Sequence, residues 1–297
     1  MTRPARSPAE SAARLRGIAL MCLAMLLFSV LDTAAKYVSQ YMPSLEVVWA
    51  RYAVSLAFAV AVLRPWANLA DYTVRRPFIQ ALRGLFLLGS TILNFLALRY
   101  LQLAETAAIA FAAPFFIVGL AGPVLGEWAG PRRWAAAVIG FVGVIIVVQP
   151  GPDTFQPAAL LSLGAACCYA GYNLTTRLLA TTESPAGMLI YPAALATALL
   201  TPPLPFVGTL PPDWLVGALM LLTGAAGGLG HWFLIVAHRR APASLLAPFQ
   251  YTQILWMPVF GFLVFSDVPT RNTLIGAAII VASGLYILYR ERVHHDR

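Results

Sequence analysis

Apolar residues run along this chain in long segments, and the charges and most of the prolines gather in the short stretches between them. An α-helix needs about 20 apolar residues to cross the hydrocarbon core of a bilayer. No stretch is left over for a water-soluble domain, and the first apolar run continues into Asp32 and Lys36 without a cleavage-like site. The pattern predicts ten membrane-spanning helices, over residues 16–38, 45–63, 78–101, 104–125, 132–149, 157–179, 186–208, 213–237, 242–265 and 270–289.

Composition supports a membrane protein. Of the 297 residues, 60% are hydrophobic and 11% are charged, whereas a soluble domain carries about 25% charged residues. Most of the surface is therefore expected to face lipid. Cys22, Cys167 and Cys168 lie in apolar runs without the spacing of a disulfide or a metal site, so we interpret them as packing residues.

The chain has 20 Lys and Arg residues against 12 Asp and Glu, an excess that can indicate binding to nucleic acid. The positions of the basic residues instead favour a membrane protein. With the N-terminus in the cytoplasm, 15 of the 20 lie in cytoplasmic connections or tails, and only Arg99 and Arg271 lie on the opposite side. This is the positive-inside pattern of membrane proteins. It predicts an even number of spans with both termini in the cytoplasm.

The chain also repeats itself at a nearly constant offset, which indicates a five-span unit. Because five is odd, the second unit would cross the membrane in the opposite direction to the first. Inverted repeats of this kind are typical of alternating-access carriers, whose solute site lies near the midplane between the halves. The matched positions are 138 to 141 residues apart: Phe28 with Tyr169, Asp32 with Asn173, Lys36 with Arg177, Ser44 with Ser184, Phe95 with Phe233, Glu127 with Asp267, and Gly143 with Gly284.

Several short runs carry a resemblance to a known family. They are Ala104–Ala108, Pro114, Gly126–Glu127, Arg133–Trp134 and Gly140–Gly143 in the first half, with a degenerate copy in Ala247–Tyr251, Asp267, Gly276 and Gly284. Their order and duplication resemble the EamA repeat of the drug/metabolite transporter superfamily.

The resemblance implies an all-α membrane protein of ten transmembrane helices in two inverted five-helix repeats around a central solute pathway. The implied organisation is a cytoplasmic tail over 1–14, repeats over 15–149 and 157–290 with a linker at 150–156, and a cytoplasmic tail over 291–297. The second copy has Ser266–Asp267 where the first has Gly126–Glu127.

Within the superfamily, the runs Asp32–Tyr37 and Ala247–Tyr251 look most like bacterial members that take up S-adenosylmethionine or riboflavin. The resemblance therefore implies a secondary transporter of a small organic metabolite in a bacterial-type inner membrane, with export of amino acids or other metabolites as the alternative. The expected partners are the solute and the lipid bilayer, with no nucleic acid, cofactor or metal, in a monomer or homodimer.

The ninth predicted span is the first candidate for solute contact. Pro248 frees a backbone carbonyl, and broken helices in membranes are tolerated where they line a cavity. Aromatic and amide groups near it suit a planar, partly polar solute, although a packing kink is the alternative. The candidate substrate-binding residues are Gln250, Tyr251, Gln253, Trp256, Asn173, Trp232, Phe115, Asn94 and Arg83.

A second group is the candidate for gating or proton coupling: Asp32, Lys36, Arg51 and His231. Asp32 and Lys36 are one helical turn apart, so they share a face and can pair. A charge inside the membrane costs at least about 2.5–3.5 kcal/mol, so these groups are expected to face inward. The alternatives are a buried ion pair for the charged residues, a packing role for His231, and snorkelling to the interface for Arg83.

Other functional classes lack their signatures. An intramembrane enzyme needs a nucleophile with a base, an acid pair or a metal cluster, and the sequence has no HExxH, GxSxG or Cys/His grouping. A channel usually needs a ring of like residues, which the sequence does not show. A carrier without catalytic residues is the prediction.

Overall fold

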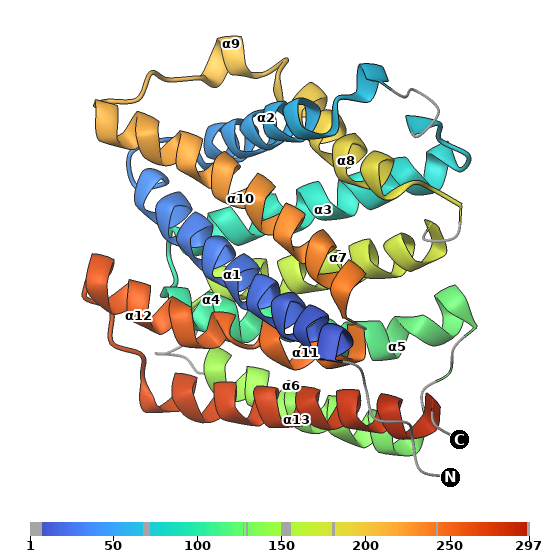
Figure 1. Cartoon of the computed structure of the whole chain (residues 1–297). Coiled ribbons are helices and arrows are strands. Elements are labelled where there is room, and N and C mark those ends of the chain that lie inside the picture. Colours follow the sequence, from blue (N-terminus) through green and yellow to red (C-terminus); the bar gives the residue numbers. More distant parts are fainter. Residues whose placement is uncertain are drawn as a thin grey trace.

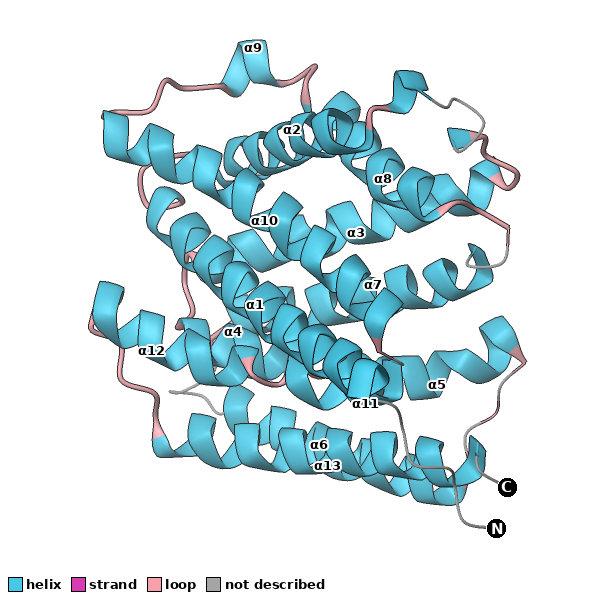
Figure 2. Cartoon of the chain, in the orientation of Figure 1, coloured by secondary structure: helices cyan, strands magenta, loops and turns pink. Residues whose placement is uncertain are grey.

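The computed structural model describes residues 8–67, 72–126, 128, 130–149, 156–179, 182–241 and 243–295. In this part of the chain the only regular elements are helices (Figure 2). In chain order they are α1 Pro8–Val38, α2 Ser44–Leu63, the 3-10 helix η1 Pro65–Ala67, α3 Pro77–Leu98, α4 Leu103–Ala110, α5 Ala113–Leu125, α6 Pro131–Val148, α7 Ala158–Leu179, α8 Pro185–Leu200, α9 Leu204–Val207, α10 Trp214–Arg240, α11 Ala243–Gln250, α12 Gln253–Phe265 and α13 Arg271–His295.

Seven helical stretches of the described residues are long and apolar enough to cross a membrane: Leu15–Val38, Ser44–Leu63, Pro77–Leu98, Leu103–Leu125, Pro131–Val148, Pro185–Phe206 and Trp214–Arg240. Between 22% and 39% of the residues in these stretches are buried in the protein. The remaining residues are mostly apolar and are partly or fully exposed, as expected for helices that face lipid. The chain is therefore a multi-pass membrane protein.

The other three predicted spans are also helical, but each departs from a long apolar helix. α7 carries polar residues in its last two turns. The ninth predicted span is divided into α11 and α12, of 8 and 13 residues, and the apolar part of α13 is short, Arg271–Ile287. Helices that carry polar groups or breaks need protein around them.

Two of the predicted spans are interrupted near their middle. α4 and α5 are separated by a turn at Phe111 and Ala112, and α11 and α12 by a turn at Tyr251 and Thr252. The expectation of a broken ninth span is thus confirmed, although the break lies three residues after Pro248, which itself stays inside α11.

The helices pack in pairs that join distant parts of the sequence. α1 packs along α10, α3 along α7, and α6 along α13, where the two helices run side by side (Figure 1). Glycines permit the close approach: a Cβ atom on Gly143 would lie 2.9 Å from the Gly276 carbonyl oxygen of α13. Two glycines of α10 act in the same way, because Gly224 and Gly228 pack against Val54 and Phe58 of α2.

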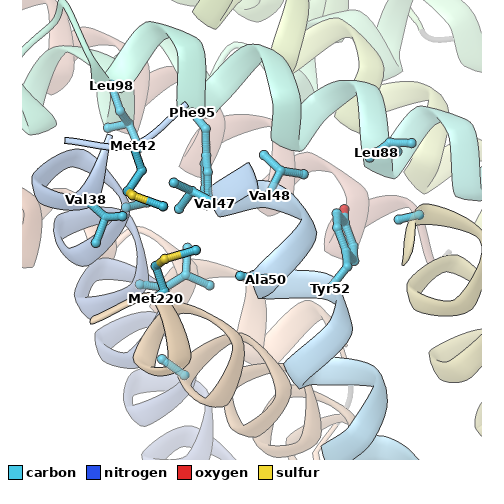
Figure 3. Packing of buried hydrophobic residues seen from close by; sticks show 14 of the residues in the cluster. Val38, Met42, Val47, Val48, Ala50, Tyr52, Leu88, Phe95, Leu98 and Met220 are labelled. Atoms are coloured by element: carbon cyan, nitrogen blue, oxygen red, sulfur yellow. The ribbon is translucent and has the colours of Figure 1, made fainter. Parts of the chain in front are cut away.

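The largest buried apolar cluster lies between α1, α2, α3 and α10 (Figure 3). Phe95 and Leu98 of α3 pack there with Val47 of α2 and Met220 of α10. This cluster holds together the end of the bundle at which α1 passes into α2. The first turn of α1 and the last turn of α13 lie at the opposite end (Figure 1).

Helix ends and loops are fixed by carboxylates. Glu105 accepts a hydrogen bond from the Gln102 backbone N–H (3.0 Å) and completes a capping box at the start of α4. Glu183 likewise accepts from the backbone N–H groups of Arg75 and Arg76, just before α3. Glu127, which the sequence matches with Asp267, lies outside the described residues.

Candidate functional site

An aspartate on α1 meets two side-chain amides from distant helices. Asp32 accepts hydrogen bonds from Asn94 of α3 (Nδ2 to Oδ1, 3.2 Å) and from Gln253 of α12 (Nε2 to Oδ2, 3.4 Å). We call these three residues the Asp32 cluster. The sequence singled out all three, and the structure brings them together although they come from three helices. Within the described residues the Asp32 carboxylate has no Lys or Arg at ion-pair distance.

The expected pairing of Asp32 with Lys36 is wrong. The Lys36 ammonium forms its ion pair with Asp267 (Nζ to Oδ2, 2.7 Å), donates to the Leu101 carbonyl (3.0 Å), and lies 4.7 Å from the centre of the Phe265 ring. The reason is that α12 ends beside the end of α1. The long lysine side chain reaches a carboxylate there, while the short Asp32 side chain is held by amides.

We call this arrangement the Lys36 clamp. It joins three segments at the end of the bundle opposite the first turn of α1: the end of α1, the α3–α4 connection, and the segment after α12. Lys36 is 8% exposed. A buried charge with a bonded carboxylate is satisfied within the protein.

A pocket with a cavity volume of about 50 Å³ opens between α2, α3, α7, α8 and α10. Arg51 lines it as the one residue with a fixed charge, and His231 lines it as well. The other lining residues are aromatic, small or aliphatic: Tyr52, Ser55, Phe58, Ala59, Leu87, Tyr172, Met188, Leu189, Pro192, Ala193 and Gly228. The wall is thus mostly apolar and aromatic with a few polar groups, the usual composition of a small-molecule site.

Arg51 is held on the pocket wall by α3. One guanidinium nitrogen donates to the Thr91 hydroxyl (NH1 to Oγ1, 2.6 Å). The guanidinium carbon also lies 5.0 Å from the centre of the Tyr52 ring and 5.7 Å from that of Phe95, within the range of cation–π attraction. Thr91 and Asn94 are three residues apart on α3, so the anchor of Arg51 and the Asp32 cluster share one helix face.

Arg83 has different surroundings. It is 3% exposed, and its guanidinium donates to the Thr176 hydroxyl (2.7 Å), the Met188 carbonyl (2.8 Å) and the Tyr172 hydroxyl (3.0 Å). It therefore does not snorkel to the interface. It joins α3 to α7 and α8, and its hydrogen bonds go to the protein.

The two helix breaks touch each other through an aromatic stack. The Tyr251 ring, in the turn between α11 and α12, stacks on the Phe111 ring in the turn between α4 and α5, with centres 4.7 Å apart. Tyr251 also contacts Gly284 of α13. Gln250 is the last residue of α11, directly before Tyr251, and its side chain is half-buried. Trp256 is more exposed and stacks on Phe260 of the same helix.

The remaining predicted residues are dispersed. His231 of α10 lines the pocket and meets the Phe28 ring edge-on (5.0 Å between centres), whereas Trp232 does not line it. Asn173 donates back to the Tyr169 carbonyl of its own helix (2.7 Å). Phe115 is buried in a cluster beside Gly140 of α6. The structure thus unites Asp32, Asn94 and Gln253, and separately Arg51 and His231.

Sequence reasoning missed the tyrosines of the pocket and the partner of Lys36. Tyr52 and Tyr172 adjoin residues that were singled out, Arg51 and Asn173, but a tyrosine in an apolar helix gives no signal of its own. Thr91 was noted only as weakly polar. Asp267 was available through its match with Glu127, and its distance of 231 residues from Lys36 hid the contact.

A bundle of apolar helices with two broken segments and a mostly apolar pocket that carries a few polar groups is typical of a membrane protein that handles a small solute. Comparison with known proteins gives the family. The model of the EamA-like transporter family matches residues 15–149 and again residues 156–289. The chain belongs to the EamA-like transporter family, and it is a transporter rather than an enzyme.

Curated relatives cover nearly the whole chain. The S-adenosylmethionine uptake transporter of Rickettsia felis is 29% identical over 94% of this chain and 94% of its own. The riboflavin transporter of Vibrio cholerae is 30% identical, over 92% and 93%. The pseudopaline exporter CntI of Pseudomonas aeruginosa is 25% identical, over 90% and 94%. One crystal structure, 20% identical, has the same fold, with a TM-score of 0.63 over 95% of this chain and 99% of the other.

Proposed function

We propose that this transporter takes up a cofactor-like metabolite across the inner membrane, with S-adenosylmethionine as the first candidate. Asp32 and Arg51 carry the proposal. They have opposite charges, neither has an ion-pair partner among the described residues, and both bond to the same face of α3. S-adenosylmethionine offers a sulfonium and an ammonium to a carboxylate, a carboxylate to a guanidinium, and an adenine to the aromatic rings of the pocket.

The relatives support this choice. Matches at 28% and 29% identity to S-adenosylmethionine uptake transporters of Rickettsia prowazekii and Rickettsia felis extend over 94% of the chain. Riboflavin is the second candidate, because the pocket has Tyr52, Phe58 and Tyr172 for a planar ring system and the Vibrio cholerae riboflavin transporter is similarly related. Riboflavin is uncharged, so it would not use the Asp32 carboxylate as an ion partner.

We further propose ten spans in two inverted five-helix repeats, 15–149 and 157–290. The packing of the helices supports it. If each span is replaced by the span five places away in the chain, the pairs of helices in contact stay the same. The contact of α1 with α10 becomes that of α7 with α3, and α2 with α8 and α6 with α13 map onto themselves. The two breaks also correspond, since Phe111 and Tyr251 are 140 positions apart.

The ends of the two broken spans support the same proposal. The residue after α5, Gly126, has φ 74°, and the residue after α12, Ser266, has φ 57°; both are left-handed and they are 140 positions apart. Left-handed residues also end α2 and α6, so it is the matched position of the two ends that supports the repeat. The basic residues favour both termini in the cytoplasm.

In an alternating-access cycle, the Lys36 clamp would close the non-cytoplasmic side. Lys36 of α1 and the α3–α4 connection belong to the first proposed repeat, and Asp267, after α12, belongs to the second, so the clamp joins the two repeats. Two repeats that rock against each other must break and remake such a contact. Opening towards the outside would then require the Lys36–Asp267 ion pair to separate.

The test is transport by the purified protein in proteoliposomes. Labelled S-adenosylmethionine should enter by a saturable process that an excess of the same solute inside accelerates. S-adenosylhomocysteine, the thioether without the sulfonium charge, should compete weakly. Riboflavin uptake instead would favour the second candidate. Flux that neither saturates nor shows counterflow with either solute would contradict the proposal, and comparing proteoliposomes of both orientations would distinguish uptake from export.

A further inference from the structure

We infer that Arg51 is the anion-recognition residue of this transporter and holds a carboxylate of the solute in the pocket between α2, α8 and α10. This assigns Arg51 to the solute itself rather than to a gate. The inference rests on the proposed function for the identity of the solute, but its chemistry, a carboxylate next to a planar group, follows from the pocket alone.

The first argument is the number of donors left over. A guanidinium has five N–H groups. Within the part of the chain that the structure describes, Arg51 donates one side-chain hydrogen bond, to the Thr91 hydroxyl. Arg51 also lines a pocket that contains no carboxylate among its lining residues. A guanidinium with free, adjacent donors is the group that binds a carboxylate in a bidentate manner.

The second argument is that the group is held in place before any ligand arrives. The Thr91 hydroxyl that receives Arg51 is also 2.7 Å from the Tyr52 hydroxyl, and it donates to the Leu87 carbonyl (3.0 Å). The rings of Tyr52 and Phe95 lie against the guanidinium. Figure 3 shows Tyr52 on α2 and Phe95 on α3 in the packed core beside this site. A cation fixed in this way loses little freedom on binding.

The third argument is the wall beside Arg51, which is formed by glycines of α10. Gly228 lines the pocket, and at Gly227 the helix packs closely, because a Cβ atom there would lie 3.6 Å from Arg51 Nε and 3.1 Å from Leu31. A larger residue at Gly227 would press on the guanidinium. The rings of Phe58, Tyr172 and His231 line the same pocket. A solute that carries a carboxylate and a planar heterocycle fits this combination.

The test uses pairs of solutes that differ by one carboxylate, bound to the purified protein: S-adenosylmethionine with decarboxylated S-adenosylmethionine, and tryptophan with tryptamine. The wild type should bind the carboxylate member of at least one pair about 10- to 100-fold more tightly, the usual value of a charged hydrogen-bonded contact. In R51Q this preference should disappear, while the affinity for the decarboxylated member stays within about 2-fold.

The matched control is R99Q, which removes an exposed arginine directly after α3 that does not line the pocket. It should leave the ratio within each pair unchanged. If R51Q does not accumulate, R51K decides: lysine keeps the charge but not the fork, so the preference should fall about 10-fold, and a full preference would contradict the inference.

Two results would overturn the inference. One is an equal loss of both members of a pair in R51Q, which would make Arg51 a residue of the fold or gate. The other is the absence of any carboxylate preference in the wild type. If the protein does not bind S-adenosylmethionine but prefers tryptophan over tryptamine through Arg51, the inference about Arg51 would hold and S-adenosylmethionine would be excluded as the solute.

Discussion

Two arginines lie inside the helical bundle, and their surroundings differ. Arg83 donates to α7 and α8 through three hydrogen bonds and is almost fully buried. Arg51 makes one hydrogen bond and opens onto a pocket. A cation within a membrane is costly, and around Arg83 the protein offsets that cost alone. Around Arg51 it leaves donors for something that binds and departs.

The same contrast separates the two charges of α1. Lys36 has a carboxylate, a carbonyl and a ring around it, whereas Asp32 has only two amides at 3.2 and 3.4 Å. In both pairs, one charged group has several protein partners and the other has few, so we use the number of protein partners to distinguish a structural or gating group from a solute-binding one.

The largest effect is expected for R83Q. Glutamine cannot reach Thr176, Met188 and Tyr172 together, so three partly buried partners lose their donor at a cost of about 3 kcal/mol in the free energy of unfolding. The thermal midpoint of the purified protein should fall clearly. A midpoint equal to that of the wild type would show that Arg83 does not stabilise the fold.

Next in size is D32N. The amide preserves the shape and part of the hydrogen bonding with Asn94 and Gln253 but removes the charge, so the affinity for S-adenosylmethionine should fall about 30-fold. Binding of S-adenosylhomocysteine, which lacks the sulfonium charge, is the control and should change less. Equal losses for the two solutes would argue against recognition of the cation by Asp32.

The Lys36 clamp should matter for rate. K36M or D267N leaves one partly buried charge without its partner, and we expect the transport rate to fall about 10-fold. A completely buried ion pair would give a larger loss, but the Asp267 side chain is 24% exposed, so solvent weakens this interaction. The exchanged pair K36D/D267K should recover most of the rate. A double variant as slow as the single variants would show that the ion pair is not the relevant contact.

The smallest effect is expected for T91V. Valine keeps the volume of Thr91 but removes the hydroxyl that orients Arg51, so the affinity for S-adenosylmethionine should weaken about 5-fold with little change in the thermal midpoint. T106V, at a buried threonine that bonds only within its own helix, is the control in affinity measurements. Equal affinities of T91V and wild type would mean that Arg51 is positioned by the rings alone.

The helices could be predicted well from the sequence because the residues that define a helix lie close together in the chain. The apolar runs, the prolines at Pro77, Pro131 and Pro185, and the glycines Gly224 and Gly228 each mark an element or a close contact within a few residues. Of the two breaks, the sequence predicted the one in the ninth span, through Pro248; the break at Phe111 and Ala112 was not predicted.

The site was less predictable because its contacts are not local. Asp32 meets Gln253 across 221 residues and Lys36 meets Asp267 across 231. Helical spacing placed Asp32 and Lys36 on one face, but only the position of α12 decides which of them meets a carboxylate and which meets an amide. Tyr172 became a pocket residue through the packing of α7 against α3, which no pattern within either helix specifies.

The central claim, that Arg51 serves the solute and Arg83 serves the fold, is tested most directly by one thermal-shift experiment on R51Q and R83Q with and without S-adenosylmethionine. We predict that R51Q keeps a midpoint close to that of the wild type but loses the stabilisation by the ligand. R83Q should melt at a lower temperature and retain that stabilisation. The reverse pattern, with R51Q unstable yet stabilised by ligand and R83Q stable yet unresponsive, would contradict the account.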